Sequence, residues 1–155
     1  MGNQVTEQLV AQLLEKHYTI ASCESLTGGL FASTLAEIPG VSGSLKGGVV
    51  TYWTEIKEKV AGVSAETVAE HGVVSAETAF EMAAGIRKLF DVDVAVSFTG
   101  NAGPDTMVGK LAGLVYTCII IRDKVYPFCD QIDLPRNKLR QQIVDQTIKR
   151  IKENL

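Results

Sequence analysis

Hydroxyl groups stand beside paired glycines near the start of the chain. In residues 19–29 a short apolar, β-prone segment runs directly into Ser25, Thr27, Gly28 and Gly29. A serine hydroxyl becomes a nucleophile when a base removes its proton. Glycines at a helix start let backbone N–H groups approach an anion, and the helix terminus adds partial positive charge. The same residues also suit an ordinary strand–turn–helix junction with Ser25 or Thr27 as the N-cap.

A second segment, residues 47–57, carries side chains that could activate a serine. Tyr52 lies on a predicted strand, and Lys57 lies on the helix predicted to follow it. A lysine serves as a base only if its pKa falls from about 10.4 toward neutrality, through desolvation or a neighbouring positive charge. The sequence leaves open the alternative of a half-buried tyrosine and a solvated lysine.

A third segment, residues 100–110, is a glycine-containing loop with exposed backbone donors, which suit a phosphate or a carboxylate. It is not a Walker A loop, because Pro104 occupies a required glycine position and Leu111 stands where a hydroxyl would bind magnesium. A dinucleotide-binding G-x-G-x-x-G pattern is also missing. The residues that we expect to contact an anion are Gly100, Asn101, Ala102 and Gly103.

Alternating helical and strand patterns must position these three segments. Periodicity and cap signals predict helices over 5–14, 30–38 and 55–61, one beginning at Ser64, and two over 75–90 and 137–152. Strand patterns cover 18–23, 48–53, 92–99, 113–121 and 125–132. The apolar runs in two of these strands indicate burial on both faces. We predict a three-layer α/β/α sandwich with a mixed, mainly parallel sheet of about five strands, and a ligand edge after the first and third strands.

Composition narrows the class of protein. A chain of 155 residues that is 46% hydrophobic suits a single domain over 1–155. The net charge of −3 and the lack of long Lys/Arg runs argue against nucleic acid and membrane partners. No signal peptide or membrane span is predicted, so we expect a cytoplasmic protein. Three widely spaced cysteines without a C-x-x-C pattern predict neither disulfides nor a metal site.

Taken together and in order, the motifs resemble the CinA C-terminal domain family, the PncC-type nicotinamide mononucleotide amidohydrolases. The family patterns A-E-S-x-T-G-G, G-x-V-T-Y-x-N-x-x-K, G-V-S, G-I-A-G-P and G-D-R-x-x-x-R are met by residues 23–29, 48–57, 73–75, 100–104 and 134–140. The resemblance covers nearly the whole chain. Each pattern is weak alone, and their joint occurrence makes the resemblance specific.

The resemblance implies an anticodon-binding-domain-like fold and hydrolysis of the carboxamide of nicotinamide mononucleotide to nicotinate mononucleotide and ammonia, without metal or cofactor. By position, Ser25 would be the nucleophile, and Tyr52 and Lys57 would transfer protons; which of the two is the base stays open. The expected partners are a small-molecule nucleotide and further copies of the chain in a homo-oligomer.

Substrate binding is expected from Glu24, from the backbone of Thr27, Gly28 and Gly29, and from the loop over 100–103. Backbone N–H groups near the glycine pair could hold the oxyanion. The loop could hold the nucleotide phosphate together with Arg136 or Arg140, since arginine offers a planar fork; solvation of both arginines is the alternative. Glu24 is expected either to orient a ligand hydroxyl or to cap the turn.

Several positions depart from the family pattern. Asn101 replaces isoleucine, Thr54 replaces asparagine, Thr106-Met107 replace glycines, Lys110-Leu111 replace Lys-Pro, and Leu134-Pro135 replace Gly-Asp. The candidate trio is kept, and the surrounding walls differ. An altered substrate, or nucleotide binding without turnover, is therefore the alternative function.

Overall fold

A computed structural model describes residues 2–105 and 109–155. Within these ranges no helix is both long and apolar enough to cross a membrane. The elements, in chain order, are α1 (Gly2–Lys16), β1 (Ile20–Glu24), α2 (Leu30–Ala36), a 3-10 turn (Val41–Gly43), β2 (Leu45–Val50), α3 (Thr54–Ala61), α4 (Ala65–His71), α5 (Ala76–Phe90), β3 (Val94–Gly100), β4 (Leu114–Ile121), β5 (Lys124–Gln131) and α6 (Arg136–Asn154).

The five-stranded sheet has the strand order β2-β1-β3-β4-β5. Strand β1 pairs in parallel with β2 and β3, and β4 is antiparallel to both β3 and β5. Strand β4 therefore runs against the other strands, and the predicted mixed sheet is confirmed. The central strand β3 is buried along its whole length, as its apolar run predicts.

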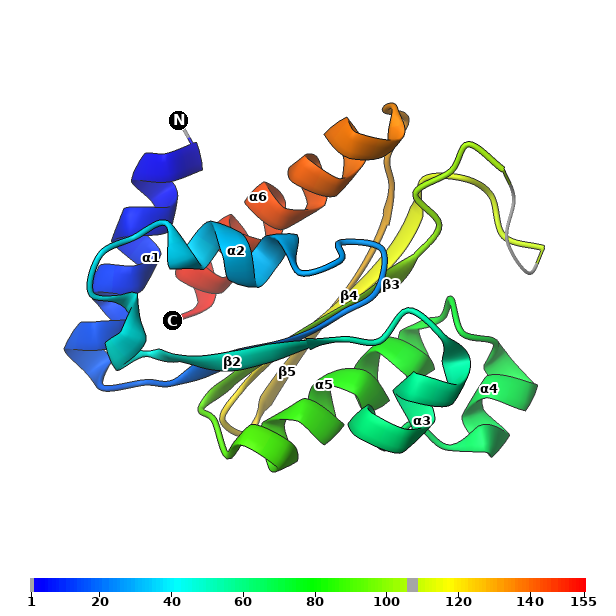
Figure 1. The fold of residues 1–155 in the computed structure, drawn as a ribbon, viewed down its shortest axis with the longest axis horizontal. Helices are drawn as coiled ribbons and strands as arrows, with labels where there is room; N and C mark the ends of the chain where they lie inside the picture. The colour runs from blue at the N-terminus through cyan, green and yellow to red at the C-terminus, as the bar shows by residue number, and fades with distance from the viewer. Residues whose placement is uncertain (1, 106–108) are drawn as a thin grey trace.

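Helices cover both faces of this sheet, which confirms the predicted three layers. Helices α1, α2 and α6 lie on one face, and α3, α4 and α5 lie on the other (Figure 1). Helix α5 packs on β3, β4 and β1, while α1 packs against α6. The sheet is thus held between two helical layers.

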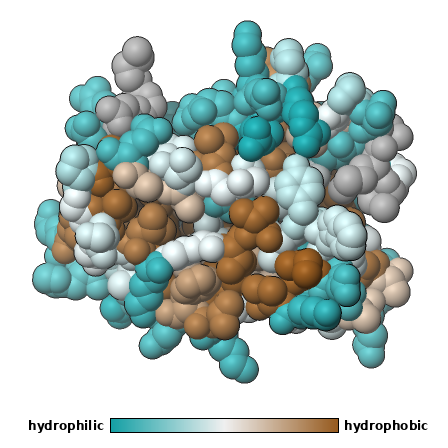
Figure 2. Space-filling view, viewed as in Figure 1, coloured by the Kyte–Doolittle hydropathy of each residue, from teal (hydrophilic) through white to brown (hydrophobic). Residues whose placement is uncertain are grey.

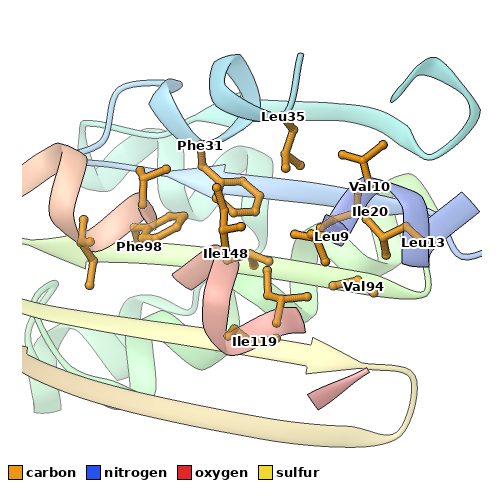
Figure 3. Close-up of a cluster of buried hydrophobic side chains, with 14 of the residues drawn as sticks. Leu9, Val10, Leu13, Ile20, Phe31, Leu35, Val94, Phe98, Ile119 and Ile148 are labelled. Atoms are coloured by element: carbon orange, nitrogen blue, oxygen red, sulfur yellow. The ribbon is translucent and has the colours of Figure 1, made fainter. Parts of the chain in front are cut away.

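The larger apolar core fills the space between the sheet and helices α1, α2 and α6 (Figure 3). The helical stripe predicted for α1 supplies Leu9 and Leu13, both fully buried. Phe31 of α2 and Phe98 of β3 meet with ring centroids 5.5 Å apart. Full burial of each such side chain contributes about 1.5–3 kcal/mol. This core fixes α2 against the carboxyl end of β1, where the serine motif begins.

One strand begins and ends three residues earlier than predicted. The pattern favours residues 48–53, whereas β2 spans Leu45–Val50. The Thr51 amide still donates to the Glu24 carbonyl, at 2.8 Å, after which the chain leaves the sheet and Trp53 becomes the N-cap residue of α3. Aromatic residues are common in strands because they pack well there, but Tyr52 and Trp53 are exposed, so the helix start overrides the propensity.

Candidate active site

Three segments meet at one edge of the sheet. Strands β1, β2 and β3 are parallel, so their carboxyl ends lie together, as expected for the ligand edge. Ser25 follows β1 directly, and its amide donates to the Phe98 carbonyl of β3 at 3.2 Å. Thr51 follows β2, and Asn101 follows β3. The fold therefore brings the serine motif, the Tyr–Lys motif and the glycine-containing loop to the same place.

Glu24 shapes the loop that presents Ser25. Its carboxylate is 1% exposed and accepts hydrogen bonds on both oxygens. The carboxylate thereby caps the first turn of α2 from inside the protein. Of the two roles expected for Glu24, the geometry favours the cap, because its oxygens already accept from five protein donors: Ser22 Oγ, Thr27 Oγ1 and the amides of Gly29, Phe31 and Ala32.

Arg140 of α6 holds the same loop from the other side. Its Nε donates to the Leu26 carbonyl and its Nη2 to the Thr27 carbonyl, both at 2.9 Å. Gly28 and Gly29 have φ angles of 60° and 99°, and a Cβ on Gly28 would lie 3.3 Å from the Arg140 Nη2 atom. The glycine pair is thus needed for the backbone path and the close approach. In this structure the Arg140 guanidinium is directed at the loop.

Lys57 reaches Ser25 from the first turns of α3. Its Nζ lies 3.1 Å from the Ser25 Oγ, and the two residues are 2% and 6% exposed. The ammonium also donates to the carbonyls of Thr51, at 2.5 Å, and Tyr52, at 3.1 Å. When Lys57 loses a proton, these carbonyls can keep the two remaining N–H groups. The lone pair then faces the serine hydroxyl, which is the geometry that a general base requires.

Burial prepares Lys57 for this role. Desolvation disfavours the ammonium and lowers the pKa of Lys57 from 10.5 to about 8. The neighbouring Cys23 would oppose this shift only as a thiolate. Burial raises the pKa of Cys23 to about 11, so its thiol is neutral at pH 8 and adds no charge. A larger fraction of Lys57 is therefore neutral near pH 7 to 8 than for a lysine in water.

Tyr52 lies apart from this pair. Its side chain is 51% exposed, and its hydroxyl accepts a hydrogen bond from Arg136 Nη2 at 3.0 Å. Arg136 Nη1 also donates to the Gly103 carbonyl at 2.8 Å. In the described part of the chain, the Tyr52 hydroxyl makes no hydrogen bond to Ser25 or Lys57. The structure thus brings Lys57 to the serine. It places the Tyr52 hydroxyl with Arg136 at the exposed edge of the site, which we call the rim.

The backbone donors expected around residues 27–29 are only partly available. The Gly28 amide donates to the Ser25 carbonyl at 3.0 Å, and the Gly29 amide donates to the Glu24 carboxylate. Among the described hydrogen bonds, the amides of Leu26 and Thr27 have no acceptor. Of the backbone donors in this loop, the amides of Leu26 and Thr27, and not those of the glycines, are thus left without a described protein acceptor.

Asn101 organises the loop that follows β3. Its side-chain amide donates to the Asp105 carbonyl at 2.6 Å, and its oxygen accepts from the Gly103 amide at 2.9 Å. The Gly103 amide, expected to contact an anion, is thus engaged within the loop. Asn101 therefore stabilises a loop shape that an isoleucine at this position would not support by hydrogen bonding.

A cavity of about 530 Å³ lies between this loop and the segment that leads into α6. Arg136 lines it and also contacts Tyr52, so the cavity adjoins the rim of the site. The departure at Thr106-Met107 lies outside the described residues. The remaining lining residues are Ala102, Gly103, Pro104, Ala112, Gly113, Ile132, Asp133, Leu134 and Pro135.

Two residues that surround Lys57 are missing from the sequence-based prediction. Thr51 contributes a backbone carbonyl, which residue type cannot reveal, and Cys23 contributes a buried neutral thiol. The only signal in the sequence was their position: Thr51 comes immediately before Tyr52, and Cys23 comes immediately before Glu24. Among the described residues, no group of three or more His, Cys, Asp and Glu side chains is arranged to hold a metal ion.

Comparisons with known proteins show which family and fold the chain is similar to. The family model for the CinA C-terminal domain matches residues 2–155. A relative from Listeria welshimeri, named a competence-damage inducible protein, is 42% identical over 150 residues, which are 96% of this chain and 36% of the relative. A relative with the same name from Limosilactobacillus fermentum is 47% identical over 123 residues, which are 79% of this chain and 30% of the relative. The chain spans about a third of the length of these relatives.

Solved structures share the whole fold. A CinA superfamily protein from Klebsiella pneumoniae superposes with a TM-score of 0.96 at 28% identity, covering 99% of this chain and 96% of that protein. The competence/damage inducible protein CihA from Agrobacterium tumefaciens has a TM-score of 0.92 at 30% identity, with coverage of 97% and 93%.

Proposed function

The chain belongs to the CinA C-terminal domain family, and we propose that it hydrolyses the carboxamide of nicotinamide mononucleotide to nicotinate mononucleotide and ammonia. The observation that carries this proposal is the buried contact between Lys57 and Ser25. A lysine whose Nζ lies 3.1 Å from a serine Oγ, with its pKa lowered to about 8, is arranged to activate that serine.

The reaction begins when Ser25 Oγ attacks the carboxamide carbon while its proton passes to neutral Lys57. The oxyanion that develops is held by the amides of Leu26 and Thr27. As the C–N bond breaks, Lys57 returns the proton to the leaving nitrogen, and ammonia departs. Water then attacks the acyl ester with Lys57 again as the base, which releases the carboxylate and restores the Ser25 hydroxyl.

In this proposal the residues at the rim bind the nucleotide. Arg136 is exposed and lies between Tyr52 and Gly103, so its guanidinium group can reorient to bind a phosphate. Arg140 is directed at two loop carbonyls, and moving it would loosen the serine loop. We therefore assign the phosphate to Arg136 and the positioning of the loop to Arg140.

The second candidate function is a nucleotide-binding module without turnover. The Asn101-centred loop favours it, because the Gly103 amide, a donor expected to meet the nucleotide, is engaged by the Asn101 side chain. Binding could then persist while the ligand is held away from Ser25.

Incubation of the purified protein with nicotinamide mononucleotide separates the two functions. We expect ammonia and nicotinate mononucleotide in equal amounts, with much less ammonia from nicotinamide riboside, which lacks the phosphate. Saturable binding of the nucleotide without ammonia would contradict the amidohydrolase proposal and support the binding module.

A further inference from the structure

Trp53 is the only tryptophan of the chain and is 72% exposed, more than any other large hydrophobic side chain in the described ranges. Val50 and Tyr52, its neighbours in sequence, are about half exposed. Figure 2 shows that hydrophobic side chains gather in the middle of the face seen there, within a hydrophilic surround. Trp53 thus offers an uncovered aromatic face in the segment that leads into α3.

The backbone ties Trp53 to the catalytic pair. The Tyr52 carbonyl, one peptide bond away, accepts from Lys57 Nζ at 3.1 Å, and the Trp53 carbonyl accepts from the Lys57 amide at 3.0 Å. Trp53 is the N-cap residue of α3, the helix that follows β2 in the chain (Figure 1). The backbone of Trp53 is therefore fixed next to the lysine that faces Ser25, and its exposed side chain starts from this point.

We propose that Trp53 determines specificity by stacking its indole on the planar ring that bears the scissile carboxamide. The proposal rests on the proposed function and names the group that recognises the ring. A pyridinium ring is planar, cationic and electron-poor, and the indole face is the strongest aromatic partner for a cation. The Tyr52 hydroxyl is held by Arg136, whereas no hydrogen bond, ion pair or ring contact is described for the Trp53 side chain.

Fluorescence of the protein tests the stacking directly, since Trp53 is the sole indole. In the Ser25→Ala variant, which keeps bound substrate intact, nicotinamide mononucleotide is expected to quench the emission saturably. Ribose 5-phosphate, which lacks the ring, should leave the emission unchanged, and free N-acetyltryptophanamide corrects for absorption and collisional quenching. Quenching no stronger than that of the free indole would overturn the proposal. A shift of emission on dilution without ligand would also overturn it, because a second copy would then cover Trp53.

Steady-state kinetics supply the second arm. Stacking acts equally on substrate and transition state, so Trp53→Ala should raise KM about tenfold and change kcat less than about threefold. Trp53→Phe keeps an aromatic face and should recover most of the affinity. Leu89→Ala, an exposed position near the end of α5 and away from the site, is the matched control.

The experiments distinguish a failure of the stacking proposal from a failure of the amidohydrolase proposal. An unchanged KM in Trp53→Ala, with wild-type turnover intact, overturns the stacking alone. Saturable quenching in a protein that releases no ammonia overturns the amidohydrolase proposal and leaves the stacking supported.

Discussion

The site contains two polar pairs that differ in burial. Ser25 and Lys57 are nearly inaccessible, and backbone carbonyls fix the lysine. Tyr52 and Arg136 form a hydrogen bond at 3.0 Å on an exposed rim. Burial disfavours the ammonium strongly enough to lower the pKa of Lys57, whereas solvent screens charges at the rim. Under the proposed function, the inner pair carries out the chemistry and the outer pair binds the nucleotide reversibly.

The largest effect is expected at the inner pair from Ser25→Ala. Without the hydroxyl no acyl ester forms, and ammonia release should fall by more than about 1,000-fold. The unfolding free energy should change by only about 1 kcal/mol, because the hydroxyl makes a single described hydrogen bond. Ser33→Ala, at an exposed serine of α2, is the control. Retained turnover would remove Ser25 from the nucleophile role.

Lys57→Met is the next test of the inner pair. Loss of the base should lower kcat at least about 100-fold. Methionine is apolar and of similar length, so removal of the buried charge offsets the loss of donors to two carbonyls, and the thermal midpoint should move by only a few degrees. Lys59→Met on the same helix, where the lysine is exposed, is the control. A loss of less than about threefold would show that Lys57 has no part in proton transfer.

Arg136→Gln tests the outer pair. The substitution removes the charge that bridges Tyr52 and the Gly103 carbonyl, so KM should rise about tenfold while kcat falls much less. Lys138→Gln, also exposed at the start of α6, controls for charge alone. If kcat fell as far as in Lys57→Met, the functional distinction between rim and interior would be wrong.

Chelation should affect neither pair. Ser25 is activated by a lysine and its oxyanion is held by amides, so activity is expected to be unchanged after exhaustive EDTA treatment. Ammonia release is compared before and after chelation. Activity lost to EDTA and restored by zinc or manganese would contradict the serine–lysine mechanism.

The fold could be predicted closely because burial and caps leave strong signals. Apolar runs located β3 and β4. Serines predicted to begin α4 and α5 are the N-caps of these helices: Ser64 accepts from the Thr67 amide and Ser75 from the Thr78 amide. Strand β2 was misplaced, because it is an edge strand and propensity competes there with the start of a helix. Edge strands have fewer neighbours to fix their register.

The site could be predicted by residue type but not by orientation. The motifs indicated Ser25, Lys57 and Tyr52 together, yet only the fold separates Lys57 from the Tyr52 hydroxyl. Likewise, both arginines suit a phosphate in sequence, and only the structure directs Arg140 to loop carbonyls. Backbone acceptors are not encoded by residue type, so these partners could not be read in advance.

The pH dependence of kcat/KM tests the central claim, that neutral Lys57 activates Ser25. Because burial lowers the pKa of Lys57 to about 8, the neutral fraction falls as the pH drops below that value. We expect kcat/KM to rise about tenfold per pH unit up to about pH 8 and then to level off. The residual activity of the Lys57→Met variant should not show this rise. A flat profile across that range, or a limb near the ordinary lysine pKa of 10.5, would contradict the claim.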